Sequence, residues 1–350
     1  MTEKLAPSFL QRWRGALITL PIVILLPFVV GLLEGESLTA VLSNSAGTSK
    51  FVQGLAIEVF ILALYALSYD LIFGITGLLS FGHSMFFAVG AYLTGALLKS
   101  FGLSLWETLA WVAVASVAQA LLFGLVLPRV KGITFALVTL GIASVFHIMI
   151  MSRELGDFTG ADVGLQGILK PDFLNPANER LRLYYAALLL LVLMYYLYKR
   201  FVDSPTGRVC VAIRENEGRA LMLGYNTFKF KLAALLLSSF TAALAGSLHA
   251  IFQPIVSPNI ASLGFTVTAL LIILIGGVGT LEGALVGALV YRLLDFGLRR
   301  YMGESASFIN GIIYVTIVIF LPYGIVGTWR MKSFHIKQGW DRLSGYFKWG

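Results

Sequence analysis

Polar side chains interrupt a long apolar stretch between residues 74 and 95, which reads GITGLLSFGHSMFFAVGAYLTG. Glycines let helix backbones approach closely, and a broken backbone is tolerated at membrane depth only where it faces protein or water. Ser80 and His83 would be costly in contact with lipid, so we expect both to face inward. The stretch is therefore either a tight packing seam with paired polar groups or the wall of a solute pathway.

A second glycine-rich segment, residues 276–287, reads GGVGTLEGALVG. Its only charged residue is Glu282, which can interact favourably with the N-terminus of the helix expected to follow. The two segments are compatible with a repeated architecture, but the sequence has no clear self-similarity.

Several ionisable residues fall within or beside apolar stretches. An ionisable group at membrane depth is a functional hypothesis by default. Glu58 and Asp70 are therefore either functional intramembrane groups or members of structural pairs and helix caps. Arg292 and Asp295 are three residues apart and can pair on one helix.

Motifs that carry enzyme chemistry are absent from the sequence. It contains no GxxxxGK[ST] nucleotide loop, no HExxH and no GxSxG. His147 and His249 are isolated and are interpreted as structural, and the four histidines lack zinc-site spacing. No group of several buried carboxylates indicates a proton relay, which weakens a secondary-transporter interpretation. We expect no catalytic residue, metal or cofactor in this chain, and no enzymatic activity.

The amino-acid composition indicates the class of protein to which these residues belong. Of the 350 residues, 58% are hydrophobic and 13% are charged, whereas a soluble domain is about half apolar and about a quarter charged. This excludes a soluble globule and a disordered chain, and the single cysteine, Cys210, excludes a disulfide framework. The net charge of +8 does not indicate nucleic-acid binding, because the basic residues lie between apolar segments.

The apolar segments predict an all-α, polytopic integral membrane protein with about ten transmembrane helices. A helix needs about 20 apolar residues to cross the bilayer. The ten expected spans are residues 15–33, 51–73, 83–98, 105–127, 133–151, 183–198, 232–252, 260–276, 283–298 and 308–325.

The basic residues set the orientation. Ten spans place both termini on one side, and 17 of the 26 basic residues then fall on that side. The positive-inside rule makes it the cytoplasm. We expect a cytoplasmic N-terminus (1–14) that leads into an uncleaved first helix, one transmembrane domain (15–327), and a basic cytoplasmic tail (328–350). Arg299 and Arg300 fall on the outer side in this topology, which is contrary to the positive-inside rule.

Two longer segments join the spans. Residues 152–182 lie outside and are either a plain connection or a surface that receives a soluble partner or gates entry. Residues 199–231 lie inside and hold 7 of the basic residues. There, Asp203 to Gly207 have turn chemistry, and a short amphipathic helix is expected over residues 216–223 with Gly224 at the C′ position. This helix lies either on the bilayer surface or in a groove of a soluble partner.

Four stretches carry a resemblance to a known family. They read GITGLLSFGHSMFFAVGAYLTGALL, AIRENEGRALMLGYNTFKFKLAALLLSSFTAALAGSLHA, GGVGTLEGALVGA and LPYGIVGTW. Together they resemble the membrane permease subunits of branched-chain amino acid ABC importers, in the order the family has them, over most of residues 51–329.

The resemblance implies an ABC importer permease fold in the bacterial cytoplasmic (inner) membrane and a set of partners. These are a second related permease, two ATP-binding cassette subunits that hold ATP and Mg, a periplasmic substrate-binding protein and the lipid bilayer. Each permease supplies half of the path for branched-chain, hydrophobic amino acids.

The resemblance also implies roles for particular residues. A cytoplasmic coupling helix that docks on the ATPase corresponds to Glu217, Ala220, Leu221 and Gly224, although Gly218-Arg219 stands where small residues are commoner. The residues expected to line the translocation path are Ser80, Gly82, His83, Phe86 and Gly90.

Other functions stay open at this stage. Within the same class, importers of urea or short-chain amides have similar permeases, and importers of aromatic acids and other carboxylates are further relatives. A stand-alone carrier or channel would transport without partners. A membrane enzyme would turn over substrate alone, but the sequence offers it no catalytic constellation.

Overall fold

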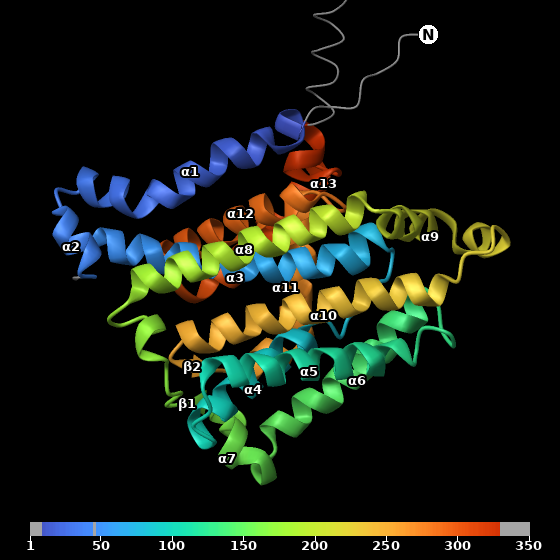
Figure 1. Cartoon of the computed structure of the whole chain (residues 1–350), viewed down its shortest axis with the longest axis horizontal. Coiled ribbons are helices and arrows are strands. Elements are labelled where there is room, and N and C mark those ends of the chain that lie inside the picture. Colours follow the sequence, from blue (N-terminus) through green and yellow to red (C-terminus); the bar gives the residue numbers. More distant parts are fainter. Residues whose placement is uncertain (1–8, 45–46, 330–350) are drawn as a thin grey trace, which may run out of the picture.

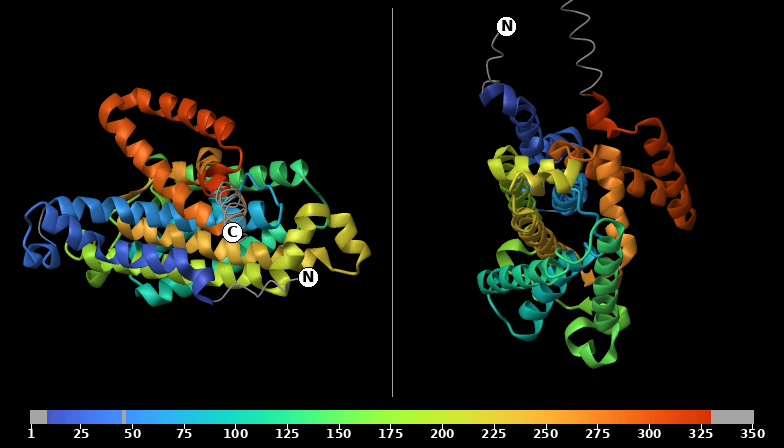
Figure 2. Two further views of the ribbon diagram at one scale, coloured as in Figure 1. Left: turned by 90° about the horizontal axis from the view of Figure 1, so that it is seen from above. Right: turned by 90° about the vertical axis from the view of Figure 1, so that its right-hand side faces the viewer.

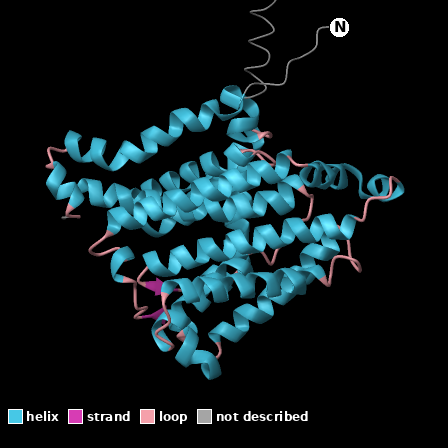
Figure 3. Cartoon of the chain, viewed as in Figure 1, coloured by secondary structure: helices cyan, strands magenta, loops and turns pink. Residues whose placement is uncertain are grey.

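The computed structural model describes residues 9–44 and 47–329, and the chain there is almost entirely helical (Figure 3). The longer helices are α1 (Phe9–Leu33), α3 (Thr48–Asp70), α4 (Ser84–Ser100), α5 (Leu105–Gly124), α6 (Ile133–Met151), α8 (Arg180–Asp203), α9 (Pro205–Met222), α10 (Thr227–Phe252), α11 (Leu263–Gly276), α12 (Leu281–Met302) and α13 (Ala306–Phe320). The shorter elements are α2 (Leu38–Leu42), α7 (Gly156–Thr159), the π-helical turn η1 (Leu71–Ile75), the 3-10 turns η2 (Arg153–Leu155), η3 (Ala161–Val163), η4 (Asp172–Leu174), η5 (Pro258–Ala261) and η6 (Gly303–Ser305), and the strands β1 (Leu165–Gln166) and β2 (Ile255–Val256).

Each of the ten expected spans is occupied by a helix, which confirms the all-α, polytopic prediction. Six helices of the described chain are long and apolar enough to cross a membrane, and a seventh span results if α11 and α12, bent by 110° at their junction, count as one. The count is below ten because α11 and α12 form this bent pair, α4 has only 17 residues, and Thr19–Leu33 of α1 is likewise a shorter apolar helix. Much of the predicted N-terminal segment (1–8) and nearly all of the basic tail (330–350) lie outside the described residues.

Helix α3 runs through the middle of the bundle. It packs against α1, α8, α10, α11 and α12 (Figure 1). Nearly all of its residues from Ile57 to Asp70 are buried. A helix that is apolar on all sides must be enclosed by other helices or by lipid, and here the protein itself supplies most of the enclosure.

Helices α4 and α10 approach each other closely because glycines lie at their contact. A Cβ atom at Gly90 would collide with the backbone of Ala243, and one at Gly246 would collide with the backbone carbonyl of Phe87. Near these glycines, Thr94 Oγ1 donates a hydrogen bond to Ser247 Oγ at 2.8 Å. Small residues and interhelical hydrogen bonds are the usual means of holding membrane helices together.

Both glycine-rich segments break the helices that carry them. Helix α3 passes into the π-helical turn η1 and then an irregular stretch up to Ser84, in which Gly77 has φ +78°. Helices α11 and α12 meet at a sharp corner where Gly277 has φ +127° and Gly279 has φ +74°. Only glycine adopts such values without strain. We call residues 74–79 the first glycine turn and residues 276–280 the second.

The two ends of the bundle differ in character. Helix α9 projects from one end, whereas α2, α7 and the strand pair lie at the other (Figure 1). The strands are antiparallel, with Leu165 opposite Val256 and Gln166 opposite Ile255. They join the 152–182 segment to the end of α10, so this segment is a folded cap rather than an extended connection.

Candidate functional site

The segment 199–231, expected as a loop, is mostly helical. Ser204 Oγ accepts a hydrogen bond from the Gly207 amide at 3.2 Å, and Pro205 occupies the first helical position of α9. Serine at the N-cap followed by proline is a strong helix start. The prediction of a turn over Asp203 to Gly207 was therefore wrong beyond Ser204, because those residues start α9.

The expected short helix is the second part of α9. The backbone at Asn216 is non-helical (φ −162°, ψ 100°), and its side-chain oxygen accepts a hydrogen bond from the Arg219 amide at 2.9 Å. At the other end, Gly224 has φ +85°, its amide bonds to the Leu221 carbonyl, and the Tyr225 amide bonds to the Ala220 carbonyl. These bonds form a Schellman motif with glycine at C′. The predicted helix over 216–223 is confirmed, and we call 217–222 the coupling helix.

Glu217 fixes the coupling helix to the membrane helices. Its Oε1 accepts hydrogen bonds from Lys231 Nζ at 2.5 Å and Thr227 Oγ1 at 3.1 Å, both in the first turns of α10. Lys131 Nζ, in the connection between α5 and α6, lies 3.9 Å from the other carboxylate oxygen. Partial burial raises the pKa of the Glu217 carboxyl, but the hydrogen bonds and charge of Lys231 outweigh it, so the pKa is lowered. The carboxylate therefore faces inward.

The coupling helix presents a mixed surface. Ala220 is 3% exposed and packs with Val209, Ile213 and Phe230. In contrast, Leu221, Met222 and Leu223 are 47%, 88% and 72% exposed. An exposed run of large apolar side chains at the end of a bundle marks a contact surface for a partner or a membrane.

Arg214, which the sequence analysis did not single out, lies just before the coupling helix and contacts the first glycine turn. Its Nη1 donates a hydrogen bond to the backbone carbonyl of Gly74. Its Nη2 lies 2.8 Å from Glu215 Oε1. The only signal for this role was a basic residue beside the apolar run 209–213.

Asp70 joins the two glycine turns. Its Oδ1 accepts a hydrogen bond from the Gly279 amide at 2.7 Å. A Cβ atom at Gly279 would lie 3.1 Å from both the Gly74 carbonyl oxygen and Arg214 Nη1. Of the two roles considered for Asp70, the structural pairing is therefore present in the structure. We call residues 214–222 the coupling segment, and this segment, α3 and the α11–α12 corner meet at this point.

A small cavity of about 80 Å³ lies between the coupling segment and the first glycine turn. Its walls are the 76–79 backbone, the 130–132 connection and the side chains of Arg214, Glu217 and Lys231. The cavity shows that the coupling segment and the first glycine turn border the same polar space.

The residues expected to line a solute path form a buried cluster. Ser80, His83 and Phe86 are each 0% exposed. The structure brings Gly82 against the backbone of Thr139 in α6, and Gly90 against α10. All five residues lie in the interior of one subunit, and their role in a path stays a prediction.

His83 is the centre of this buried cluster. Its Nε2 lies 2.8 Å from Ser68 Oγ, which is also within hydrogen-bond distance of the Tyr65 carbonyl. The ring stacks on Tyr65 and packs against Tyr69. Within the described chain, His83 Nδ1 has no hydrogen-bond partner. A polar group left unpaired in a core is unfavourable in this conformation.

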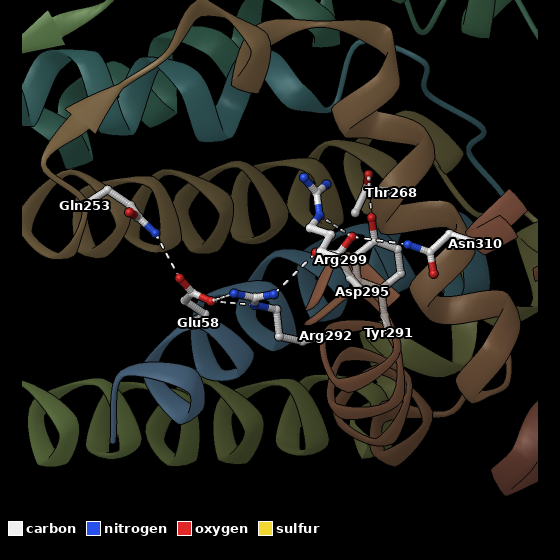
Figure 4. Close-up of polar contacts among 8 residues, drawn as sticks. All are labelled: Glu58, Gln253, Thr268, Tyr291, Arg292, Asp295, Arg299 and Asn310. Atoms are coloured by element: carbon white, nitrogen blue, oxygen red, sulfur yellow. Dashed lines mark hydrogen bonds and ion pairs between the residues drawn. The ribbon is translucent and has the colours of Figure 1, made fainter. Parts of the chain in front are cut away.

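Glu58 belongs to a separate network on α3, α10, α12 and α13 (Figure 4). It pairs with Arg292, and its Oε1 accepts a hydrogen bond from Gln253 Nε2 at 3.1 Å. Arg292 Nη1 lies 3.3 Å from Asp295 Oδ2, which confirms the pairing predicted on that helix. The pairing of Glu58 with Arg292 was not predicted, because 234 residues separate them.

The long apolar helices define a multi-pass helical membrane protein, with α9 projecting from one end of the bundle. The family model described as "Branched-chain amino acid transport system / permease component" matches residues 51–321. The chain belongs to this family of transport permeases, which confirms the resemblance drawn from the sequence and gives the chain a transport role.

Individual relatives agree with this assignment. The high-affinity branched-chain amino acid transport system permease protein LivM of Salmonella typhimurium is 28% identical over 309 residues, covering 81% of this chain and 72% of LivM. LivM of Escherichia coli K12 is 28% identical over 300 residues, covering 79% of this chain and 70% of that LivM. The high-affinity branched-chain amino acid transport system permease protein LivH of Escherichia coli K12 is 23% identical over 282 residues, covering 76% of this chain and 91% of LivH. No solved structure matches the chain.

Proposed function

We propose that this chain is one of two related permeases in an ATP-driven importer of branched-chain amino acids and forms half of the solute path. The names of LivM and LivH support the substrate class, since both are branched-chain amino acid permeases. That one organism holds both, and that both are similar to this chain, supports pairing with a second, related permease.

The remaining parts of the importer follow from the same proposal. Two ATP-binding cassette subunits hold ATP and Mg and meet the coupling helix, so hydrolysis takes place outside this chain. A periplasmic binding protein delivers the solute to the folded cap over residues 152–182. The distribution of basic residues supports an inner-membrane orientation with both termini and α9 in the cytoplasm.

The observation that carries the proposal is the set of contacts made by the coupling segment. Its outer side exposes Leu221, Met222 and Leu223. Its inner side is tied to α10 through Glu217 and to the first glycine turn through Arg214. A displacement of the exposed side would therefore move α10 and the point where α3 and the α11–α12 corner meet.

This geometry supports alternating access. When the ATPase subunits close on ATP, the coupling helix moves with them and shifts the start of α10 and both glycine turns. Helices that are broken at glycines can reorient as short rigid pieces, so the path opens to the outside, and hydrolysis reverses the shift. The energy comes from the partner's nucleotide state and biases two conformations of this chain.

The buried cluster around His83 borders the path in this proposal. Ser80, Gly82, His83, Phe86 and Gly90 follow the first glycine turn directly and continue into α4. Because they are enclosed in the present conformation, contact with solute requires α4 to separate from α6 or α10. Unpaired groups such as His83 Nδ1 then gain water or solute as partners.

The test is uptake by the assembled importer in proteoliposomes. The complex of both permeases, the ATPase subunits and the binding protein should accumulate labelled leucine when ATP is present on the ATPase side. It should not do so with a non-hydrolysable analogue or when this chain is reconstituted alone. Accumulation of labelled urea in place of leucine would support the amide importer instead. Uptake by this chain alone would support a stand-alone carrier.

A further inference from the structure

The network around Glu58 and Asp295 places two carboxylates and two guanidinium groups within the membrane part of the chain. Glu58 lies in the candidate span Thr48–Ile75, and Arg292, Asp295 and Arg299 lie on α12. The formal charges cancel. Charged groups at this depth are expensive unless they pair or line an aqueous cavity, and they mark solute pathways in transport proteins.

Most of the hydrogen-bonding capacity of the network is satisfied internally. Arg292 contacts Glu58 through Nε and Nη2 and Asp295 through Nη1. Asp295 Oδ1 accepts hydrogen bonds from Arg299 Nε at 2.8 Å and from Asn310 Nδ2 at 3.2 Å. These contacts fix the two carboxylates and Arg292 in place (Figure 4).

Beside the Asp295 carboxylate, some hydrogen-bond donors and some hydrogen-bond acceptors have no partner in the described chain. The two terminal nitrogens of Arg299 donate no hydrogen bond to any described residue, and its side chain is 65% exposed. Asn310 is 6% exposed and Tyr314 is 5% exposed, yet Asn310 Oδ1 and Tyr314 Oη lack partners in the described chain. Buried polar atoms without partners call for an explanation, and a ligand is one.

The position of the network favours a ligand that arrives from beside the subunit. The far end of α12 and helix α13 project from the bundle in Figure 2, whereas the rest of α12 packs against α3 and α11. The span that contains α13 is the least enclosed of the six, with 17% of its most apolar stretch buried. Gln253, at the end of α10 opposite the coupling segment, bonds to Glu58, so the network lies toward the outer side in the proposed orientation.

We infer that this network is a subsite for the zwitterionic head of an amino acid, the α-carboxylate and α-ammonium groups. The free fork of Arg299 can accept the carboxylate in a bidentate pair. Asn310 Oδ1 and Tyr314 Oη are enclosed in this conformation, so they accept hydrogen bonds from the ammonium group only when α13 shifts away from α12. Asp295 and Glu58 then balance its charge. This inference rests on the proposed function and adds to it the groups that recognise the common part of every amino acid.

The experiment uses the whole importer in proteoliposomes, with the binding protein saturated with leucine. Arg299→Gln should lower the initial rate of ATP-driven leucine uptake by at least about tenfold, since a charge-assisted bidentate pair is lost. Arg299→Lys keeps the positive charge but lacks the pair of terminal nitrogens, so its uptake rate should lie between those of the unaltered protein and Arg299→Gln. The matched control is Glu107→Gln, a carboxylate-to-amide change at an exposed helix start on α5, which should leave uptake unchanged. Glu58→Gln should also lower uptake, but it leaves Arg292 short of a partner, so Arg299→Gln is the deciding variant.

Two results would overturn the inference. One is normal leucine uptake by Arg299→Gln. The other is loss of co-purification of Arg299→Gln with the second permease, which would make the network a contact between subunits. If the unaltered complex imports a neutral amide and no leucine, the proposed function and the subsite both fail. If the unaltered complex and Arg299→Gln import leucine equally, only the subsite fails.

Discussion

Arg214 and Gly74 are 140 residues apart in the sequence, and the guanidinium group of one donates a hydrogen bond to the backbone carbonyl of the other. Gly74 belongs to the first glycine turn, and the amide of Gly279 in the second turn bonds to Asp70, four residues before Gly74. A side chain next to the coupling helix thus contacts the point where the two interrupted helices meet. A hydrogen bond between elements of this kind is a physical route for coupling, since both of its ends lie on breaks where helices can reorient.

The pair of Glu217 and Lys231 gives the first prediction. Glu217→Gln leaves the ammonium group of Lys231, only 7% exposed, without its ion partner. Because Glu217 is itself 21% exposed, we expect a local loss of about 2 kcal/mol rather than the full penalty for a buried pair. Hydrogen exchange of residues 217–225 in the purified complex should then speed up by about tenfold or more.

The control for this pair is Lys131→Gln. Lys131 is 65% exposed and 3.9 Å from the same carboxylate, so it should change exchange by less than about threefold. The pKa of Glu217 is lowered by folding, so its contribution is complete above the ordinary value of 4.5 and is lost only as the pH falls below it. Protection that weakens between pH 8 and pH 6 in the unaltered protein would contradict the ion pair.

Gly224 gives a prediction about the end of the coupling helix. With φ +85°, it adopts a left-handed conformation, and a Cβ atom there would meet nothing within 4 Å. Gly224→Ala should therefore act through backbone strain alone, destabilising the helix end by about 1 kcal/mol. Bulky Gly224→Trp should also block partner contact, so leucine uptake and transport-linked ATPase should fall while membrane insertion persists.

Gly218→Ala is the matched control, because Gly218 lies inside the coupling helix with no positive φ, and an added Cβ atom would make only an ordinary contact with Asn216 Oδ1 at 3.4 Å. Alanine is the better helix former, so the coupling helix should be as stable as before or slightly more so. Equal effects of Gly218→Ala and Gly224→Ala on uptake would show that the Schellman end is unimportant.

Gly246 gives a prediction about the packing of α4 against α10. A Cβ atom at Gly246 would collide with the backbone carbonyl of Phe87, which cannot move aside as a side chain can. Gly246→Ala should destabilise the subunit by about 1–3 kcal/mol and lower its thermal midpoint in detergent. Gly141→Ala on α6, where nothing lies within 4 Å of the added atom, should leave the midpoint unchanged or raise it. The opposite order would contradict the close approach of the two helices.

The sequence was sufficient for features that depend on local patterns. Helices appear in all ten apolar stretches because each is a continuous, mainly apolar run, and the coupling helix is followed by Gly224 because glycine favours the left-handed C′ position. The Arg292–Asp295 pair follows from helical spacing, which brings residues three apart onto one face.

Contacts between distant segments were beyond the reach of local patterns. The pairing of Glu58 with Arg292, the bond from Gly279 to Asp70 and the reach of Arg214 to Gly74 all depend on which helices become neighbours. The start of α9 was mistaken for a turn because Ser204, Pro205 and Gly207 favour turns as well as helix starts. The bend between α11 and α12 likewise depends on tertiary packing around Gly277 and Gly279.

The most direct test of the account is the number of leucine molecules imported per ATP hydrolysed by the assembled complex when Arg214 is replaced by methionine. Arg214→Met keeps much of the side-chain length but cannot donate to the Gly74 carbonyl. The partner subunits should continue to hydrolyse ATP, while import per ATP falls about tenfold, and Arg208→Met at an exposed position of α9 should leave the ratio unchanged. An unaltered ratio in Arg214→Met, with the complex intact, would contradict the claim that the coupling segment acts on the glycine turns through this residue.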